Sequence, residues 1–251
     1  MNNVPYVLEE TDDFAVVFKP SKMHCAPASG SFGSKNSRQA KEEDVNTLLG
    51  WFKNYFPPVF DIMHRLDYET HGLTLFAKNE KSFNYFRELQ DKNEFIKEYS
   101  AVCKKNESCE KIEGFPEYNF DLQDTSQFVN LPLTVESYFR PFGPGRKLVR
   151  PVIDDQKKHK EIARHKGGFY KTEITGINGN VFTVRIKRGF RHQIRCHLCW
   201  IGYPIYNDPL YSFMQPEPDE CELALRSHAL FFPDPATGKQ KEFRIPLLNI
   251  F

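Results

Sequence analysis

Short runs in which apolar and polar residues alternate, separated by Gly, Pro, Asn and Asp, dominate the chain. Tyr6–Glu10 and Phe14–Lys19 are rich in β-forming residues and are separated by three polar residues, which predicts an antiparallel hairpin. The same period of two recurs over Gly72–Ala77, where Leu and Ala alternate with Thr and Phe. This third run predicts a strand that packs on one face.

The same criteria predict further strands and three helices. The strands are expected at residues 95–103, 133–139, 169–177, 181–187, 223–232 and 241–246. An Asn-Gly-Asn turn at 178–180 joins two of them. Apolar residues recurring every three or four positions predict helices around 45–52, 83–89 and 191–201.

The last of these helices has an amphipathic pattern. Ile194, Leu198 and Ile201 fall on one face, whereas Arg191 and Arg195 tend toward another. We expect the apolar face to anchor the helix and leave the arginines free to meet a phosphate or a carboxylate.

Strands and helices are mixed along the chain without regular β-α-β alternation. This order favours an α+β fold around a mostly antiparallel, mixed sheet. A chain of 251 residues with 40% hydrophobic residues is long and apolar enough to bury a core. Residues 29–41, rich in Ser, Gly and Lys, are expected to form a flexible loop, and residues 104–127 a polar surface excursion.

Composition also bears on compartment and metals. The chain has no run of about 18 apolar residues and no basic-then-apolar start, so we expect a cytoplasmic protein without membrane contact. Six cysteines in a chain of this length favour reduced thiols. Cys196 and Cys199 have zinc-like spacing, but they lie in a helical pattern without a second pair, so no metal is expected.

Positive charge is concentrated in residues 140–171. This segment has ten Lys and Arg against three Asp and Glu, a net charge of +7, so the rest of the chain must carry −6 to reach the total of +1. Such a segment can grip a phosphate backbone, with Lys157, Lys158 and Arg164 as candidates, or it can be a solvated insertion. Charge alone leaves both interpretations open.

Residues 64–78 place a charged, polar loop directly before an apolar strand. Asp67 lies at the centre of the loop, two residues after Arg65, and Gly72 lets the chain turn into the strand. A carboxylate at the rim of a buried strand can act as a nucleophile or as an acid and base. The alternative is that Asp67 caps the turn and pairs with Arg65 at the surface.

Several segments of the sequence resemble motifs of the RluA-type RNA pseudouridine synthases. The loop reads His-Arg-Leu-Asp, followed by Thr70 and Gly72-Leu73, and Asp67 matches the essential aspartate of that family. The other matches follow in order along nearly the whole chain: Lys19-Pro20, the Lys-x-Tyr-x-Ala segment at 97–101, residues 189–198 and 202–211, and the strand from 225 with Asp234-Pro235 after it.

The resemblance implies a fold and an activity. It implies one catalytic domain over residues 1–251, made of two half-sheets flanked by helices with the active cleft between them. We expect no separate N-terminal RNA-binding domain, since the first predicted strand starts near residue 6. The implied activity is isomerisation of a specific uridine in structured rRNA or tRNA, after the base is flipped out. RNA is the expected partner, no cofactor is implied, and a monomer is expected.

The resemblance also suggests residue roles. Asp67, Tyr99 and Arg195 match catalytic positions, with Arg195 as the expected partner that keeps Asp67 ionised. Expected RNA contacts are Arg65, Arg188, Arg191, His192 and Gln193, together with Lys157, Lys158 and Arg164 of the basic segment.

The chain also departs from the family pattern. Phe190 stands where Arg is usual, Arg191 where Thr is usual, His71 for Ser, Phe18 for Asn and Asn207 for Gly. Two alternatives therefore stay open. One is a non-catalytic RNA-binding or RNA-chaperone protein on the same fold. The other is a glycoside hydrolase, which needs a second carboxylate; Glu69 is the candidate, and its spacing within one loop does not establish the required geometry.

Overall fold

The computed structural model describes residues 4–27, 46–106, 113–117, 130–153, 162–163, 168–212 and 222–248. The predicted loop at 29–41 and most of the excursion at 104–127 lie outside these residues. The chain divides into two compact units: Met1–Lys97 with Arg226–Leu247, and Glu98–Leu225 with Leu248–Phe251. The assignment of the whole chain to one catalytic domain stays a prediction.

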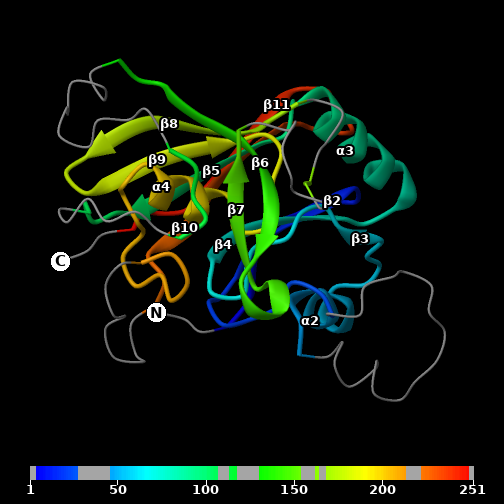
Figure 1. Ribbon diagram of the computed structural model, residues 1–251. Helices are drawn as coiled ribbons and strands as arrows, with labels where there is room; N and C mark the ends of the chain where they lie inside the picture. Colours follow the sequence, from blue (N-terminus) through cyan, green and yellow to red (C-terminus); the bar gives the residue numbers. More distant parts are fainter. Residues whose placement is uncertain are drawn as a thin grey trace. The chain divides into compact units, whose positions relative to one another are not determined.

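The first unit is built on a mixed sheet (Figure 1). Its neighbouring strands are, in order, β1 (Tyr6–Glu10), β2 (Phe14–Lys19), β4 (His71–Ala77) and β10 (Leu225–Pro233). β3 (Asp61–Ile62) pairs with β4, and β11 (Gln240–Arg244) pairs with β10. β1 and β2 form the predicted antiparallel hairpin, whereas β4 and β10 are parallel.

Two helices accompany this sheet, and both begin with a side-chain cap. α2 (Leu48–Tyr55) follows Thr47, whose hydroxyl accepts a hydrogen bond from the Gly50 amide at 3.1 Å. α3 (Glu80–Lys92) begins with a reciprocal capping box between Asn79 and Ser82. These caps satisfy amides that the first turn leaves without partners. Both predicted helices are confirmed, with shifted bounds.

β4 differs from its prediction because both of its faces are buried. Leu73 and Leu75 belong to one apolar cluster with Phe14, whereas Phe76 belongs to another and stacks on Phe52 at a centroid distance of 4.6 Å. The prediction of a strand packed on one face is therefore wrong. Alternation indicates which residues share a face, but not whether the second face is also covered.

The second unit has an antiparallel run of strands. The neighbours are, in order, β5 (Ile96–Val102), β9 (Val181–Ile186), β8 (Tyr170–Asn178), β6 (Leu133–Phe142) and β7 (Leu148–Val152). The turn predicted at 178–180 joins β8 to β9. β6 and β7 form the long green hairpin of Figure 1, closed by the 3₁₀ turn η2 (Pro144–Arg146). β7 lies in the basic segment, where no strand was predicted.

α4 (Gln193–Trp200) is buried along its whole length, including Gln193, Arg195 and His197. The predicted helix is confirmed, and of the two partners expected for its arginines, Arg195 meets a carboxylate, that of Asp208, inside the protein. Each of these polar groups has a hydrogen-bonding partner inside the protein, which makes its burial tolerable. The architecture is α+β with a mixed sheet flanked by helices, as predicted. Within the described residues, no helix has both the length and the apolar character required to cross a membrane.

Candidate active site

The loop that carries Asp67 exposes some side chains and buries others. Leu66 and Thr70 are buried, Asp67 is half-buried, and Arg65 and Tyr68 are exposed. The Thr70 amide donates to the Asp67 carbonyl at 3.1 Å, which closes a turn around the aspartate. The loop therefore presents a carboxylate together with an exposed cation and an exposed ring.

Lys19, at the end of β2, holds this loop from inside. Its side chain is fully buried, and its Nζ donates to the carbonyls of Pro20, Met23 and Tyr68 at 2.8, 2.7 and 3.2 Å. A buried ammonium is tolerated when its protons find acceptors. Lys19 thus ties the residue after Asp67 to the segment that follows β2.

Two more side chains of that segment bind the loop backbone. The Ser21 hydroxyl donates to the Glu69 carbonyl at 2.9 Å. The Cys25 thiol accepts from the Leu66 amide at 3.2 Å and donates to the Leu66 carbonyl at 3.4 Å. Burial raises the pKa of Cys25, so it stays a neutral thiol that can do both. The backbone is held on both sides of Asp67 as a result.

His64, at the start of the motif, is held in a neutral form. Its ring meets the edge of Phe95 at 5.3 Å, and both ring nitrogens are buried without a hydrogen-bond partner. Burial, and next the positive charge of Lys97, lower the pKa of His64 well below its usual range. His64 therefore supports the loop by packing and carries no charge at neutral pH.

His71 and Gly72 join the loop to β4 at a very tight contact. Arg226 of β10 donates from Nε to His71 Nε2 at 2.9 Å. Burial, with the charges of Arg226 and Lys19, lowers the pKa of His71 to about 3. A Cβ on Gly72 would lie 2.2 Å from the Ser227 carbonyl oxygen, and Gly72 has a φ of +122°. Only glycine fits this approach of two parallel strands.

In the second unit, α4 holds Arg195 in a buried ion pair. Both Arg195 and Asp208 are fully buried, and Nε and Nη2 donate to the two Asp208 oxygens at 2.8 and 2.7 Å. Asp208 Oδ1 also accepts from the amides of Leu210 and Tyr211. This bidentate arrangement orients the guanidinium. Sequence reasoning missed Asp208, and the expected pairing of Arg195 with Asp67 stays a prediction.

The other polar residues of this motif have structural contacts as well. Arg191 is exposed, and its Nη2 donates to the carbonyls of Arg146 and Leu148 at 2.7 and 3.4 Å. Gln193 is buried and bonds to the Phe190 amide and to Lys171 and Thr172. These bonds hold Gln193 inside the protein, and its expected contact with RNA stays a prediction.

His192 and Tyr211 form a second contact beside α4. His192 is half-buried in a left-handed conformation, and its Nδ1 lies 3.1 Å from the Tyr211 hydroxyl. That hydroxyl also accepts from the Val149 amide at 2.9 Å. The His192 ring is thus oriented by a residue of the same motif.

The remaining predicted residues are placed as follows. Tyr99 is buried in β5, and Arg188 is half-buried after β9. Lys157, Lys158 and Arg164 lie outside the described residues. Phe190, which replaces the usual arginine, stacks on Phe139 at 5.0 Å with nearly parallel rings. Its packing explains why an apolar ring suits this position.

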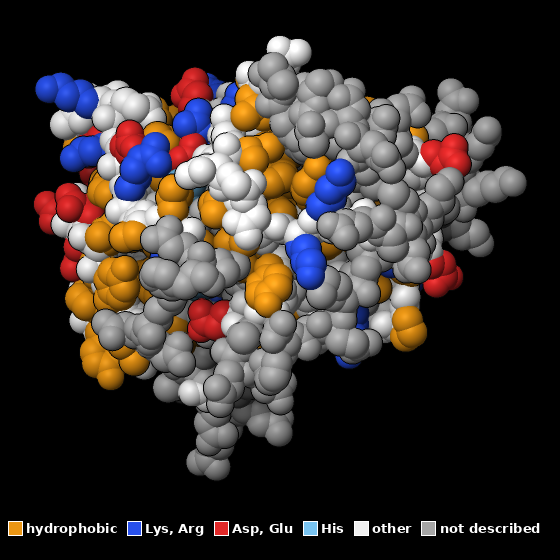
Figure 2. Space-filling model, turned by 90° about the vertical axis from the view of Figure 1, so that its left-hand side faces the viewer, with side chains coloured by type: hydrophobic (Ala, Val, Ile, Leu, Met, Phe, Trp, Pro, Cys, Tyr) orange, Lys and Arg blue, Asp and Glu red, His pale blue; other side chains and the backbone are white. Residues whose placement is uncertain are grey.

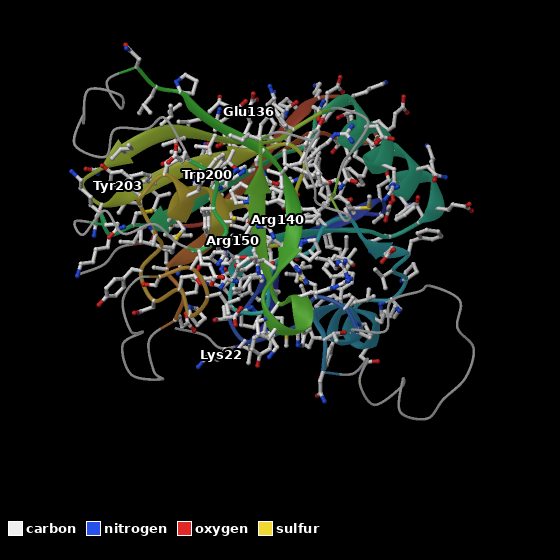
Figure 3. All side chains as sticks on the ribbon, viewed as in Figure 1. Lys22, Glu136, Arg140, Arg150, Trp200 and Tyr203 are labelled. Carbon is white, nitrogen blue, oxygen red and sulfur yellow. The ribbon has the colours of Figure 1, made fainter. Side chains whose placement is uncertain are left out.

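Two arginines of the basic segment serve the fold. Arg140 on β6 and Arg150 on β7 are cross-strand neighbours (Figure 3), and they donate to the carbonyls of Gly114 and Glu113 at 3.2 and 2.7 Å. Lys171 pairs with Glu136 at 3.0 Å. These charged side chains therefore support the structure. On the face shown in Figure 2, basic, acidic and apolar side chains of the described residues are interspersed.

A buried network around His197 also went unpredicted. Its Nδ1 lies 2.8 Å from Thr172 Oγ1 and its Nε2 lies 2.9 Å from Ser137 Oγ. Burial lowers the pKa of His197 to about 3. Gln193 shares Thr172, so the network joins α4 to β6 and β8. Nothing in the spacing of these residues along the chain signals it.

No cluster of three or more His, Cys, Asp or Glu side chains suited to a metal ion occurs in the part of the chain that the structure describes. Cys196 and Cys199, the zinc alternative, are both buried free thiols. Cys196 Sγ donates to the Val149 carbonyl at 3.6 Å.

Curated relatives match most of the chain. A Mycoplasma genitalium protein named as an uncharacterized RNA pseudouridine synthase is 27% identical over 242 residues, 96% of this chain and 66% of the relative. Ribosomal large subunit pseudouridine synthase D of Buchnera aphidicola, from Acyrthosiphon pisum, is 28% identical over 82% of this chain and 54% of its own length. The chain thus spans between half and two thirds of these relatives.

Solved structures agree on the fold. Human RNA pseudouridylate synthase domain containing 1 superposes with a TM-score of 0.63 at 17% identity, over 97% of this chain and 84% of that one. Human RNA pseudouridylate synthase domain containing 4 superposes with a TM-score of 0.57 at 16% identity, over 96% of this chain and 88% of that one. The sequence model of the RNA pseudouridylate synthase family matches residues 13–200, from β2 through the Asp67 loop to the end of α4. The chain belongs to the RNA pseudouridylate synthase family.

Proposed function

We propose that this protein converts a specific uridine of structured RNA, rRNA or tRNA, to pseudouridine in the cytoplasm, with Asp67 as the essential residue. The observation that carries the proposal is the Asp67 loop. Its backbone is held by Lys19, Ser21 and Cys25, while Asp67 itself stays half-buried beside exposed side chains. A group that must meet a substrate needs this combination of fixed position and access.

The reaction breaks the bond between C1′ and N1 of uracil, turns the base and joins C1′ to C5. The C5 proton is lost and N1 gains one, so the sum is an isomerisation that needs no redox partner. Asp67, as a carboxylate, adds to the sugar or the base, or removes a sugar proton, and then leaves again. Each route requires the same carboxylate close to the flipped nucleotide.

We assign supporting roles to residues of both units. Tyr99 is buried in β5, where its ring can stack on the base and its hydroxyl can move a proton. Arg195, whose guanidinium Asp208 orients, is the partner that the family resemblance assigns to Asp67. Arg65 is exposed two residues before Asp67 and can occupy the space of the flipped base or hold a phosphate.

The test is to incubate the protein with total RNA and to map new pseudouridines. We expect modification at few positions, and loss of at least about 1,000-fold in rate for Asp67→Asn, because an amide is a poor nucleophile and base. Asp67→Asn should fold normally, since Asp67 is half-buried. Glu69→Gln is the matched control and should retain activity.

The outcomes separate the alternatives. Modification that persists in Asp67→Asn would eliminate the role of Asp67. RNA binding without modification in either protein would favour the non-catalytic RNA-binding alternative. Release of free uracil, dependent on both Asp67 and Glu69, would favour a hydrolase.

A further inference from the structure

An exposed pair of aromatic rings includes the residue that follows Asp67 in the chain. Tyr68 follows the aspartate and is 41% exposed, and His24 of the segment after β2 is exposed as well. Their ring centroids are 4.6 Å apart and their planes are inclined by 38°. Sequence reasoning assigned no role to either residue.

Both rings are attached to a fixed backbone. The Tyr68 carbonyl accepts from buried Lys19 Nζ at 3.2 Å, and the His24 carbonyl accepts from the Leu48 amide, in the first turn of α2, at 2.9 Å. Holding the backbone reduces the entropy that a side chain loses when it binds a ligand. The two rings are therefore prepared to receive a flat group.

The neighbours of each ring explain why it faces outward. Met23 and Ala26 pack against the apolar cluster that contains Phe52, and the Cys25 side chain bonds to the loop backbone. In the Asp67 loop, on the other side of this contact, Leu66 and Thr70 are buried while Tyr68 is exposed. The residues on either side of Tyr68 and His24 fill the interior, so these two rings are not required for core packing.

The chemistry of the surface suits an unpaired nucleotide. A base turned out of a helix leaves its neighbours unstacked, and aromatic side chains replace that stacking. Arg65, exposed in the same loop, adds a cation that can hold the adjacent phosphate. The loop of Asp67 thus carries an exposed ring, Tyr68, in contact with a second ring, and an exposed cation, Arg65. These groups suit a nucleotide that flanks the reacting uridine.

We propose that Tyr68, backed by His24, is a stacking platform for an RNA base adjacent to the nucleotide that meets Asp67. This proposal deepens the proposed function, because it names how the same site grips its RNA. It does not depend on turnover: the platform binds RNA whether or not Asp67 performs chemistry.

The test measures binding with the full chain carrying Asp67→Asn, so that no RNA is modified. The probe is a stem–loop oligoribonucleotide whose loop has 2-aminopurine, a fluorescent base, next to a uridine. Tyr68→Leu should weaken the Kd about 10- to 100-fold and abolish the stacking-dependent change in fluorescence, since one base–aromatic stack is lost. Tyr68→Phe keeps the ring and should bind within about twofold of the parent.

Tyr55→Leu is the matched control, because Tyr55 is 68% exposed on α2 and belongs to the same unit. It should leave binding unchanged, and all variants should show the parent's thermal midpoint. Unchanged Kd for Tyr68→Leu, equal damage by Tyr68→Phe, or no binding by the parent would each overturn the platform. If Tyr68→Leu weakens binding but the Asp67 protein makes no pseudouridine, the platform stands and the activity falls.

Discussion

The Asp67 loop and α4 each carry a candidate catalytic residue, but they hold it in opposite ways. In the loop, side chains from another segment bind the backbone, as Lys19 and Cys25 do, and Asp67 remains half-buried. In α4, the side chains themselves are held, as Arg195 is by Asp208. The loop therefore leaves its candidate group accessible, whereas α4 holds a charge that is shielded from solvent.

This difference predicts that damage to α4 appears first as lost stability. Asp208→Asn should lower the free energy of unfolding by about 3–5 kcal/mol, because it removes the carboxylate that neutralises a fully buried guanidinium. Urea denaturation measures the effect. The double variant Arg195→Met/Asp208→Asn should recover much of the loss, since no buried charge remains and the side-chain oxygen at position 208 can still accept from the Leu210 and Tyr211 amides. A double variant as unstable as Asp208→Asn would show that packing, and not charge, dominates.

Damage to the loop supports should cost activity as well as stability. Lys19→Met removes the donor for three carbonyls, so we expect a loss of about 2 kcal/mol in unfolding free energy. Because Asp67 is then less well placed, kcat should fall about 10- to 100-fold. Pseudouridine formation at saturating RNA measures kcat.

The matched control is Lys92→Met, which removes a lysine whose ion pair with Glu88 lies at the surface of α3. It should change neither stability nor kcat measurably. If Lys19→Met lost stability but kept its kcat, the loop would not depend on this support.

Acid should weaken both regions gradually, by an increment that is smaller for each histidine and pH unit than the losses above. His71 beside the loop and His197 in α4 have folded-state pKa values of about 3, against about 6.5 in an unfolded chain. Between these values the unfolded state binds more protons, so stability is full above about pH 6.5 and declines as the pH falls toward 3. Each histidine contributes about 1.4 kcal/mol per pH unit at most.

Urea denaturation at several pH values between 4 and 7.5 checks this slope. His197→Asn should reduce the dependence on pH, whatever its effect on stability at neutral pH. A slope that stays the same in His197→Asn would show that this residue is not buried in its neutral form.

Local patterns along the chain predicted elements better than burial. The hairpin of β1 and β2 matched its predicted bounds, since turn residues and alternating side chains act over a few positions. The same patterns did not predict that both faces of β4 are covered, because the covering residues come from distant segments. They also missed β7, because it lies in a segment rich in basic residues. The charged residue of β7, Arg150, donates a hydrogen bond to the Glu113 carbonyl.

Sequence motifs alone indicated membership in the pseudouridine synthase family and singled out Asp67 as the candidate catalytic residue, because catalytic chemistry demands particular residues at short, fixed spacing. The tertiary structure alone decided what each polar group contacts: Arg195 with Asp208, His197 with Ser137 and Thr172, and the Tyr68 ring with His24. The physical reason is that burial and hydrogen bonding depend on neighbours brought together by folding, and separation along the chain carries no information about them.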